Sequence, residues 1–378
     1  MNAPRPKIDP SLLPERMSEL AGLDRVREAA TGFEAFLVGG SVRDLLLGRE
    51  RADIDIAVEG DAVDELARRL GGAARTHERF ATAAVRADGL EIDLAATRAE
   101  SYPRPGALPE IRPAPLRDDL ARRDFTVNAM AVALATPSEL VDPHGGLDDL
   151  ERGRLRILHD ESFVDDPTRA IRAARYAARY GFTLEPATAA RLQEADLGAV
   201  SRDRRVAELR KLAAEPEAPK GFALLADWGL FALEPDVREL IGAVSALLGA
   251  PPWAGMADRD EAILEAALGR GLDEARRLAE TRPSRPSEAV ALARGASGAE
   301  LALARALGAE WLDPYVSEWR RVRLEIDGDD LLSEGISEGP AIGRGLTEAM
   351  RAKLDGEVNG REEELAAALR AARESPKR

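Results

Sequence analysis

The feature that most constrains the fold is the point along the chain at which strand-forming patterns stop. Between about residue 30 and residue 150, short apolar runs of alternating polarity are interleaved with helical patterns and glycine turns. Beyond Asp148 strand patterns nearly vanish, and apolar residues recur at helical spacing. The chain is therefore predicted to be an α+β protein, with a small mixed sheet and helices in its head and an all-helical remainder.

The predicted elements of the head are short. Strands are expected at Glu34–Val38, Asp53–Glu59, Ala83–Ala87 and Leu90–Ala96, and helices at Val42–Leu47 and Asp61–Leu70. Asp88-Gly89 is a strong two-residue hairpin pattern between the last two strands, because both residue types tolerate the positive φ of such a turn. The segment Ser101–Pro115 carries five prolines and is expected to be an irregular loop.

The remainder of the chain is predicted to be helical. Helices are expected at Asp166–Tyr180, Pro186–Leu197, Arg204–Ala214, Gly221–Leu230, Asp258–Glu280, Ser287–Leu307, from Pro340, and at Arg361–Arg373. The two prolines of Arg282–Pro286 make this segment the clearest linker. Because 378 residues exceed one typical domain, we divide the chain into parts. These are a leader (1–29), a head (30–147), a helical neck (148–214) and a helical body and tail (215–378).

Composition excludes several classes of protein. The chain has no cysteine, which rules out a disulfide partner, thiolate metal sites and cysteine nucleophiles. No apolar run approaches the length of a membrane span, and Met1–Pro14 is proline-rich rather than signal-like, so we expect a cytoplasmic protein with no membrane partner. The net charge of −15 argues against a protein that merely coats nucleic acid. A nucleic-acid enzyme of this charge must concentrate its basic residues locally.

A glycine turn in the head is a candidate phosphate site. Gly39, Gly40 and Ser41 precede a predicted helix, so backbone N–H groups and a helix N-terminus would face one point. Arg43 lies in the first turn of that helix and can reach the same anion. Taken alone, the same pattern is also typical of a simple tight turn.

Three aspartates form a candidate metal site. Asp53 and Asp55 are two apart on one predicted strand, which places both carboxylates on the same face, about 7 Å apart. Asp93, on the strand Leu90–Ala96, could add a third ligand. Oxygen-only ligands favour Mg²⁺ or Mn²⁺, and two such ions can clamp the attacking and leaving oxygens of a phosphoryl transfer. The alternative is a strand with one solvated acidic face.

The joint order of these features resembles a known family. The chain has a glycine turn, a helix, an Asp-x-Asp strand and a later strand with one more Asp, in this order. This arrangement resembles the palm of the DNA polymerase β-like nucleotidyltransferases. In detail, Leu37–Asp44, Leu46–Gly48 and Asp53–Asp55 resemble the bacterial-type (class II) tRNA nucleotidyltransferase and poly(A) polymerase family. Further matching segments follow in order: Arg122–Ala131, Val141–Leu150, Asp165–Arg169, Val200–Arg204, Ile326–Leu331 and Gly339–Gly343.

The resemblance implies a fold and a set of site residues. It implies a polymerase β-like head, Mg²⁺ or Mn²⁺ at Asp53 and Asp55, and Asp93 as a third ligand or as the base for the terminal hydroxyl. Residues implied to hold the nucleotide are Gly39, Gly40, Ser41, Arg43, Arg123, Asp124, Asn128, Asp166, Arg169, Arg172 and Arg175. Among them, Asp124 would lie near the ribose, and Asp166 and Arg169 would select the base.

The neck can perform this selection. If Asp166 and Arg169 lie one turn apart on a helix, they present an acceptor and several donors to one base edge. Cytosine and adenine share an amine donor beside a ring-nitrogen acceptor, whereas uracil and guanine reverse that pattern. Phe163–Leu212 holds ten basic and seven acidic residues, a local excess of positive charge. The alternative is an exposed helix with ordinary ion pairs.

We therefore expect a tRNA nucleotidyltransferase that builds or repairs the 3′-terminal CCA of tRNA from CTP and ATP. The family usually has Glu-Asp where this chain has Asp165-Asp166, which bears on base selection. The family's flexible loop corresponds here to a short, proline-stiffened segment flanked by Arg98, Tyr102 and Arg104, which either merely connects or restricts the added nucleotide. Alternatives are a CC-adding or A-adding enzyme, a poly(A) polymerase, and a non-catalytic RNA-binding protein.

Overall fold

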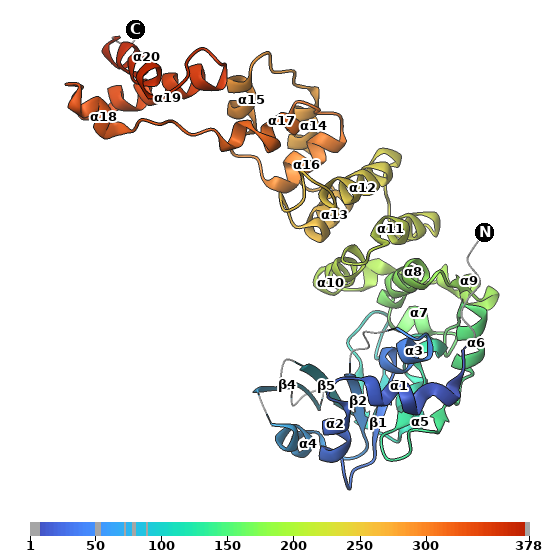
Figure 1. Cartoon of the computed structure of the whole chain (residues 1–378). Helices are drawn as coiled ribbons and strands as arrows, with labels where there is room; N and C mark the ends of the chain where they lie inside the picture. Colours follow the sequence, from blue (N-terminus) through green and yellow to red (C-terminus); the bar gives the residue numbers. More distant parts are fainter. Residues whose placement is uncertain (1–7, 50–53, 72, 78–80, 88–89, 375–378) are drawn as a thin grey trace. The chain divides into compact units, whose positions relative to one another are not determined.

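The computed structural model describes residues 8–49, 54–71, 73–77, 81–87 and 90–374. It divides into two compact units, Met1–Ala232 and Leu233–Arg378, which we describe separately (Figure 1). Asp53 and the predicted turn Asp88-Gly89 lie outside the described residues.

A seven-stranded mixed sheet forms the centre of the first unit. Its strands are β1 (Ala35–Val38), β2 (Ile54–Val58), β3 (Ala73–His77), β4 (Thr82–Ala87), β5 (Leu90–Ala96), β8 (Ala131–Ala133) and β9 (Leu140–Val141). They lie in the order β3-β4-β5-β2-β1-β8-β9. Only β2 and β5 pair in parallel, and every other neighbouring pair is antiparallel. The predicted head, a small mixed sheet with helices, is confirmed.

The predicted strands and helices of the head fall where the apolar periodicity placed them. β4 and β5 pair antiparallel up to Ala87 and Leu90, so the two strands form the expected hairpin arms. α3 (Gly40–Leu46) and α4 (Val63–Leu70) match the two predicted helices. The strands β3, β8 and β9 were not predicted, because each is short and has little alternation of its own.

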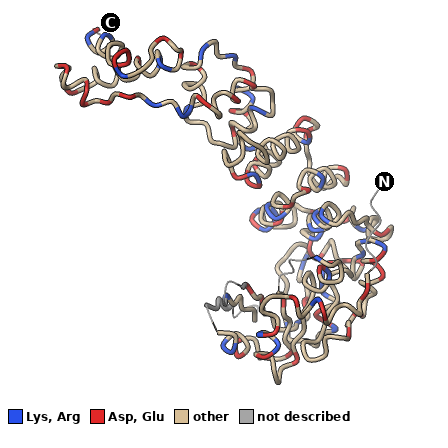
Figure 2. Tube along the Cα trace, in the orientation of Figure 1, with Lys and Arg blue, Asp and Glu red and all other residues tan. Residues whose placement is uncertain are grey.

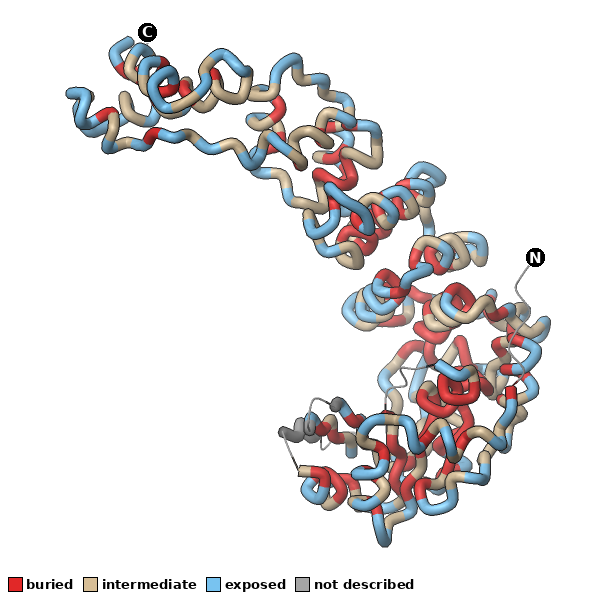
Figure 3. Tube along the Cα trace, viewed as in Figure 1, coloured by how far each residue is buried: buried red, intermediate tan, exposed pale blue. Residues whose placement is uncertain are grey.

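Helices cover the sheet and share one core with it (Figure 3). α1 (Leu13–Glu19) and α2 (Leu23–Ala29), from the segment assigned as a leader, bury Leu13, Met17, Leu23 and Val26 in that core. Neck residues such as Phe163 and Ala173 belong to the same cluster. The described part of the leader and the first neck helices therefore pack as parts of the head.

The proline-rich segment contains a hairpin, which corrects the prediction of an irregular loop over Ser101–Pro115. β6 (Arg98–Ser101) pairs antiparallel with β7 (Glu110–Pro113). Proline lacks an N–H donor, so it is tolerated in a strand only at an edge or end. Pro113 closes the last pair of a separate two-stranded sheet, which fits this rule. Residues 102–109 and 114–115 of this segment remain irregular.

Short helices and two-residue strands complete the first unit. They are η1 (Pro10–Leu12), α5 (Leu116–Ala121), η3 (Thr126–Asn128), α6 (Gly146–Arg152), β10 (Arg154–Leu155), α7 (Ser162–Asp165), α8 (Thr168–Tyr180), β11 (Thr183–Leu184), α9 (Pro186–Leu192), η4 (Leu197–Ala199), α10 (Arg202–Ala213) and α11 (Ala218–Asp227). α8 packs against α10 and α11. This arrangement sets one face of α8 toward the head.

The second unit is helical, as predicted. Its elements are α12 (Pro235–Leu248), α13 (Arg259–Ala267), α14 (Leu272–Glu280), α15 (Pro286–Ala293), α16 (Gly298–Ala306), α17 (Leu312–Ser317), η5 (Trp319–Arg321), α18 (Gly328–Ser333), α19 (Pro340–Leu354) and α20 (Arg361–Arg373). Two predicted long helices are wrong, because Gly269, Gly271 and Gly295 adopt positive φ and interrupt them. Every helix in the described residues is too short or too polar to cross a bilayer.

Candidate active site

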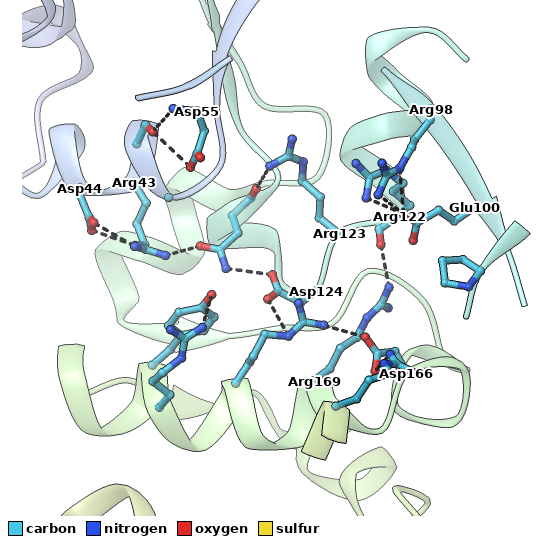
Figure 4. Close-up of a pocket in the computed structure, with 18 of the residues that line it drawn as sticks. Arg43, Asp44, Asp55, Arg98, Glu100, Arg122, Arg123, Asp124, Asp166 and Arg169 are labelled. Carbon is cyan, nitrogen blue, oxygen red and sulfur yellow. Dashed lines mark hydrogen bonds and ion pairs between the residues drawn. The ribbon is translucent and has the colours of Figure 1, made fainter. Parts of the chain in front are cut away.

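A cavity of about 520 Å³ in the first unit gathers most of the predicted site residues (Figure 4). The predicted residues that line it are Gly40, Ser41, Arg43, Asp55, Arg123, Asp124, Asn128, Asp166, Arg169, Arg172 and Arg175. They come from α3, β2, the segment around η3, and the neck helix α8. Of the remaining predictions, Gly39 and Asp93 lie outside this lining, and Asp53 lies outside the described residues.

The glycine turn is built so that a basic side chain can lie against it. Gly39 has φ +68°, and its N–H donates to the Met130 carbonyl at 3.1 Å. A Cβ at Gly39 would lie 2.5 Å from Arg123 Nη1, so only glycine leaves room for that guanidinium. Gly40 is more open, because a Cβ there would lie 3.4 Å from Arg43 Nη2 and 3.9 Å from Asp55 Oδ2. The turn therefore packs Arg123 beside the acidic strand.

Ser41 orients Asp55 in this structure. The Ser41 hydroxyl accepts the Asp55 backbone N–H at 3.0 Å and donates to Asp55 Oδ2 at 3.4 Å. Ser41 is buried, so its oxygen is directed to the carboxylate and away from solvent. The sequence predicts that Ser41 binds the nucleotide; in the structure Ser41 lines the cavity and its hydroxyl contacts Asp55.

Asp55 and Asp93 are direct neighbours across the sheet. The parallel pairing of β2 with β5 matches Asp55 with Asp93, so both side chains point to the same face. The two residues also line a second cavity of about 500 Å³, which Arg122 and Arg123 line as well. Two carboxylates in neighbouring positions repel unless a cation lies between them. Their oxygen-only donor set fits Mg²⁺ or Mn²⁺.

Arg43 is held by protein groups and joins the head to the neck. Its Nε and Nη2 donate to the two oxygens of Asp44 at 3.0 Å, its Nη1 donates to Asn128 Oδ1, and its Nη2 also donates to the Tyr180 hydroxyl at 2.6 Å. The guanidinium stacks 4.5 Å from the centre of the Tyr180 ring. Burial alone would lower its pKa, but Asp44 outweighs burial and raises the pKa. The side chain is thus a fixed cation in the cavity wall.

Arg172 bridges two carboxylates. Its Nη2 donates to Asp166 Oδ2 at 2.9 Å, and its Nε lies 3.6 Å from Asp124 Oδ2 (Figure 4). The other oxygen of Asp124 accepts the Phe125 N–H at 2.8 Å and the Asn128 amide at 2.9 Å. Burial raises the pKa of Asp124, but Arg172 and the amide donors outweigh it and hold the pKa below its usual range. Asp124 is therefore a fixed anion beside Arg172.

Asp166 precedes the neck helix, which corrects the prediction that it lies within a helix running from Asp166. α8 begins at Thr168, and Asp166 has φ −133° and ψ 89°. The residue that follows is Pro167, which disfavours helical backbone at the position before it. Asp166 Oδ1 accepts the Thr168 N–H at 3.1 Å and the Thr168 hydroxyl at 2.6 Å. The carboxylate thus caps the helix that carries Arg169 and Arg172.

Arg169 is buried, and most of its donors are occupied. Nη1 donates to Ser162 Oγ at 2.6 Å and lies 3.3 Å from His159 Nε2, while Nη2 donates to the Arg122 carbonyl at 2.7 Å. Burial first, and then the Arg169 charge, hold the pKa of His159 below its usual range. A neutral His159 can accept the Arg169 N–H. These contacts fix the plane of the guanidinium at the cavity wall.

A cluster that the sequence did not reveal connects the hairpin to the head. Asp119 accepts from Arg122 at 2.7 Å and from Arg123 at 2.9 Å, one oxygen each. Glu100 accepts from Arg122 and Arg98, both at 2.9 Å, and its other oxygen accepts the Tyr102 hydroxyl at 3.0 Å. The spacing of Asp119 from Arg122 and Arg123 is typical of ion pairs on one helical face. This spacing is the sequence pattern that could have revealed the cluster.

Residues 102–109 are docked on the neck. The Gly106 N–H points to the carbonyls of Val164 and Asp165, at 3.3 and 3.2 Å. Gly106 has φ +67°, and a Cβ there would lie 2.6 Å from the Ala199 carbonyl oxygen. Arg204 on α10 donates to the Gly106 carbonyl at 2.8 Å and to Asp166 Oδ1 at 3.1 Å. The short proline-rich loop is therefore a fixed wall of the cavity.

Further cavity residues lie on the neck. Tyr176 and Arg179 continue the row of α8 beyond Arg175, and both line the cavity. Their position could have been found by extending the helical spacing of the arginines by one more turn. The sequence pointed to Arg204 only as the last residue of Val200–Arg204, a segment that resembles the family. Nothing in the local sequence of Arg204 indicates its contact with Asp166.

Known proteins share this fold and part of the sequence. The family model of the poly(A) polymerase head domain matches residues 35–156. A CC-adding tRNA nucleotidyltransferase from Deinococcus radiodurans is 36% identical over 358 residues, which cover 91% of each chain. This chain belongs to the class II tRNA nucleotidyltransferase and poly(A) polymerase family.

Other members of the family differ in the nucleotide that their names specify. An A-adding tRNA nucleotidyltransferase from Halalkalibacterium halodurans is 46% identical over 205 residues, 51% of this chain, and the chain spans only about half (48%) of that relative's length. Among solved structures, a CCA-adding enzyme in complex with ATP superimposes with a TM-score of 0.78 at 29% identity, covering 97% of this chain and 99% of that one. The tRNA nucleotidyltransferase fold is thus shared over both units.

Proposed function

We propose that this chain is a tRNA nucleotidyltransferase that adds or repairs the 3′-terminal CCA of tRNA, using CTP and ATP. One observation carries the proposal: a single cavity brings the carboxylate Asp55 together with the neck residues Asp166 and Arg169. The carboxylate proposed to act in polymerisation and the neck residues proposed to read the base therefore line the same cavity. A non-catalytic RNA-binding protein would have no need of this pairing.

The acidic edge of the sheet would activate the acceptor hydroxyl. Asp53 and Asp55 would hold Mg²⁺ or Mn²⁺, which when bound neutralises charge on the phosphoryl oxygens. The 3′ oxygen of the RNA bonds to the α-phosphorus, the bond from the α-phosphorus to the bridging oxygen breaks, and pyrophosphate leaves. Asp93, opposite Asp55 on the sheet, would accept the hydroxyl proton or serve as a third ligand. Ser41 keeps Asp55 oriented throughout.

The basic residues would hold the sugar and phosphates. Arg123 lies against the glycine turn, where an incoming phosphate would meet its guanidinium. Arg172 and Arg175 extend the same positive wall along α8, and Asp124 with Asn128 lies beside Arg172 at the height of the ribose. Because Arg43 is held by Asp44, it would act on the phosphates mainly through its positive charge and less through a direct hydrogen bond to them.

Base selection would use the hydrogen-bonding positions left on Asp166 and Arg169. Among the described residues, Asp166 Oδ2 accepts only from Arg172, so it keeps acceptor capacity. Arg169 Nη2 donates one N–H to the Arg122 carbonyl and keeps its second. One acceptor and one donor match the shared edge of cytosine and adenine, and they mismatch uracil and guanine.

A second candidate function is partial activity, either CC-adding or A-adding. Its supporting observation is the fixed loop: Gly106 and Arg204 hold residues 102–109 and Asp166 in one arrangement. One fixed arrangement of the base reader would favour one nucleotide over the other.

Incorporation assays with single nucleotides test the proposal. Unlabelled tRNA lacking the whole CCA end, and tRNA ending in CC, would each be incubated with CTP alone, ATP alone and both, with Mg²⁺ present. Full CCA activity predicts three added residues on the first substrate and one on the second. Addition of C only, or of A only to the CC end, would support the second candidate.

The same assay tests the catalytic edge. We expect Asp55→Asn to lose at least about 100-fold in rate, on the order expected for removal of an essential charge in phosphoryl transfer, and EDTA to abolish incorporation in the wild type. Asp64→Asn, an exposed aspartate on α4, is the matched control and should retain full rate. Wild-type levels of incorporation by Asp55→Asn would refute the assignment of this edge.

A further inference from the structure

A second basic cavity adjoins the phosphate end of the nucleotide cavity. It has a volume of about 640 Å³ and is lined by four basic residues (Arg49, Arg175, Arg179, Lys211) and two acidic ones (Glu215, Glu217), together with Ala214 and Pro216. The Lys211 ammonium donates to Glu208 Oε1 at 2.9 Å. Arg175 and Arg179 line both cavities, so these two side chains lie between them. The basic colour of α8 and α10 is visible in Figure 2.

The order of residues along α8 gives the nucleotide a direction. Asp166, at the start of the helix, reads the base in the proposed function, and Arg172 beside Asp124 is at the level of the ribose. Arg175 lies about one turn further on and Arg179 another, at roughly 1.5 Å of rise per residue. The phosphates therefore extend toward the second cavity.

Arg49 is the first sign that this cavity takes an anion. Its side chain is exposed and its guanidinium lies 4.4 Å from the centre of the Tyr180 ring. Among the described residues it has no carboxylate partner. The same ring also faces Arg179 at 5.2 Å, so two guanidinium groups at this cavity are gathered on one aromatic side chain.

Arg175 is the second sign, because its contacts with protein anions are long. Its guanidinium is 4.0 Å from Glu208 and 4.0 Å from Glu215, and within the described part of the chain its one side-chain hydrogen bond, to Tyr176, is 3.5 Å. The buried Nε of Arg175 has no partner among the described residues. Arg179 is likewise 3.5 Å from Glu215. These donors remain available to a ligand with oxygens closer than the carboxylates.

We propose that the second cavity binds the pyrophosphate released by nucleotide transfer. This inference rests on the proposed function, in which the bond between the α-phosphorus and the bridging oxygen breaks and the β- and γ-phosphates leave with that bond's electron pair. The leaving group then passes Arg175 and Arg179 and meets Arg49 and Lys211. Its oxygens accept charge-assisted hydrogen bonds from these side chains.

The rival occupant of a basic surface is an RNA backbone phosphate. The two shared arginines favour pyrophosphate, because Arg175 and Arg179 would already contact the triphosphate in the nucleotide cavity. An RNA phosphate would use the same cations without depending on these shared residues. The two occupants differ in the kinetic constant that a variant changes.

The test uses the full chain with the double substitution Arg49→Gln and Lys211→Gln, which leaves the shared arginines intact. Lys220→Gln is the matched control, since Lys220 is exposed on α11 and lines neither cavity. Inhibition of nucleotide addition by inorganic pyrophosphate and the KM for tRNA would be measured for each protein. Calorimetry would give pyrophosphate affinity directly, without turnover.

We expect the double variant to raise the pyrophosphate inhibition constant at least about tenfold, the order expected when charged hydrogen bonds are lost, with a matching loss in calorimetry. The control should match the wild type. An unchanged inhibition constant together with a raised KM for tRNA would overturn the inference in favour of RNA. A wild type that adds no nucleotide would refute the proposed function, while calorimetry would still decide whether the cavity binds pyrophosphate.

Discussion

Arg204 Nη2 lies 3.1 Å from Asp166 Oδ1, while Nη1 of the same guanidinium donates to the Gly106 carbonyl at 2.8 Å. One side chain thus connects the carboxylate proposed to read the base with the loop that closes the cavity. Asp166 also caps α8 through Thr168, so the position of the carboxylate depends on two separate segments. Under the proposed function, Arg204 would be a positioning residue for nucleotide selection.

Replacement of Arg204 should alter selection more than rate. Arg204→Ala removes the contacts to Asp166 and to the loop, and we expect the preference for CTP and ATP over UTP and GTP to fall about tenfold, the order of one charged hydrogen bond. Single-nucleotide incorporation with each of the four triphosphates measures this. Arg205→Ala, which loses only a contact to the Leu197 carbonyl, is the control. An equal loss of rate for all four nucleotides would contradict a positioning role.

Gly106 should be required for docking of the loop. An alanine there would combine φ +67° with a Cβ 2.6 Å from the Ala199 carbonyl oxygen, so the loop must move away from the neck. Hydrogen–deuterium exchange should increase over residues 102–111 in Gly106→Ala. Gly181→Ala is the control, because Gly181 has the same φ of +67° and open space around its Cβ position. If exchange over residues 102–111 were the same in Gly106→Ala and Gly181→Ala, the close contact of Gly106 with Ala199 would not be what docks the loop.

The hydroxyl of Tyr180 should stabilise the contact between head and neck. It accepts from Arg43 at 2.6 Å and donates to Asp44 at 2.9 Å, whereas the Tyr176 hydroxyl has one contact, at 3.5 Å, with Arg175. Tyr180→Phe keeps the ring and leaves two buried polar groups short of a partner, so we expect a loss of about 1–2 kcal/mol in the free energy of unfolding. Tyr176→Phe should lose less than about 0.5 kcal/mol. Denaturant unfolding compares the two, and equal losses would contradict the prediction.

Acidification should destabilise the neck through His159. Burial and then Arg169 hold the folded-state pKa of His159 below the unfolded value of about 6.5. Between those two pKa values the unfolded chain binds more protons than the folded chain, so stability falls as the pH drops below about 6.5. His144, whose pKa burial also lowers, contributes in the same direction.

His159→Gln should reduce this pH dependence, because glutamine can accept the Arg169 N–H without titrating. Unfolding free energies measured about one pH unit above and about one below the ordinary histidine pKa give the comparison, and His144→Gln provides a reference for the second histidine. If the His159→Gln variant lost as much stability on acidification as the wild type, protonation of His159 would not be the cause of that loss.

Local sequence patterns predicted the two strands that carry Asp55 and Asp93. Alternation over Asp53–Glu59 and Leu90–Ala96 predicted β2 and β5, and their parallel pairing sets Asp55 beside Asp93. Period-two geometry fixes the face of each side chain once a strand forms. The glycine turn could also be predicted locally, because a backbone at φ +68° favours glycine whatever surrounds it.

The sequence by itself therefore determined the main strands and helices of the head, the change to a helical remainder, and the residue types that could bind a nucleotide. Only the tertiary structure decided which groups those residues meet. Arg43 pairs with Tyr180, 137 positions away, and Arg204 with Asp166, 38 positions away. Periodicity describes one element at a time, whereas the partner of a buried charge depends on how separate elements pack. That packing fixes the Arg43 guanidinium against Asp44 and Tyr180, and it places Asp166 before the helix, where its carboxylate accepts the Thr168 N–H.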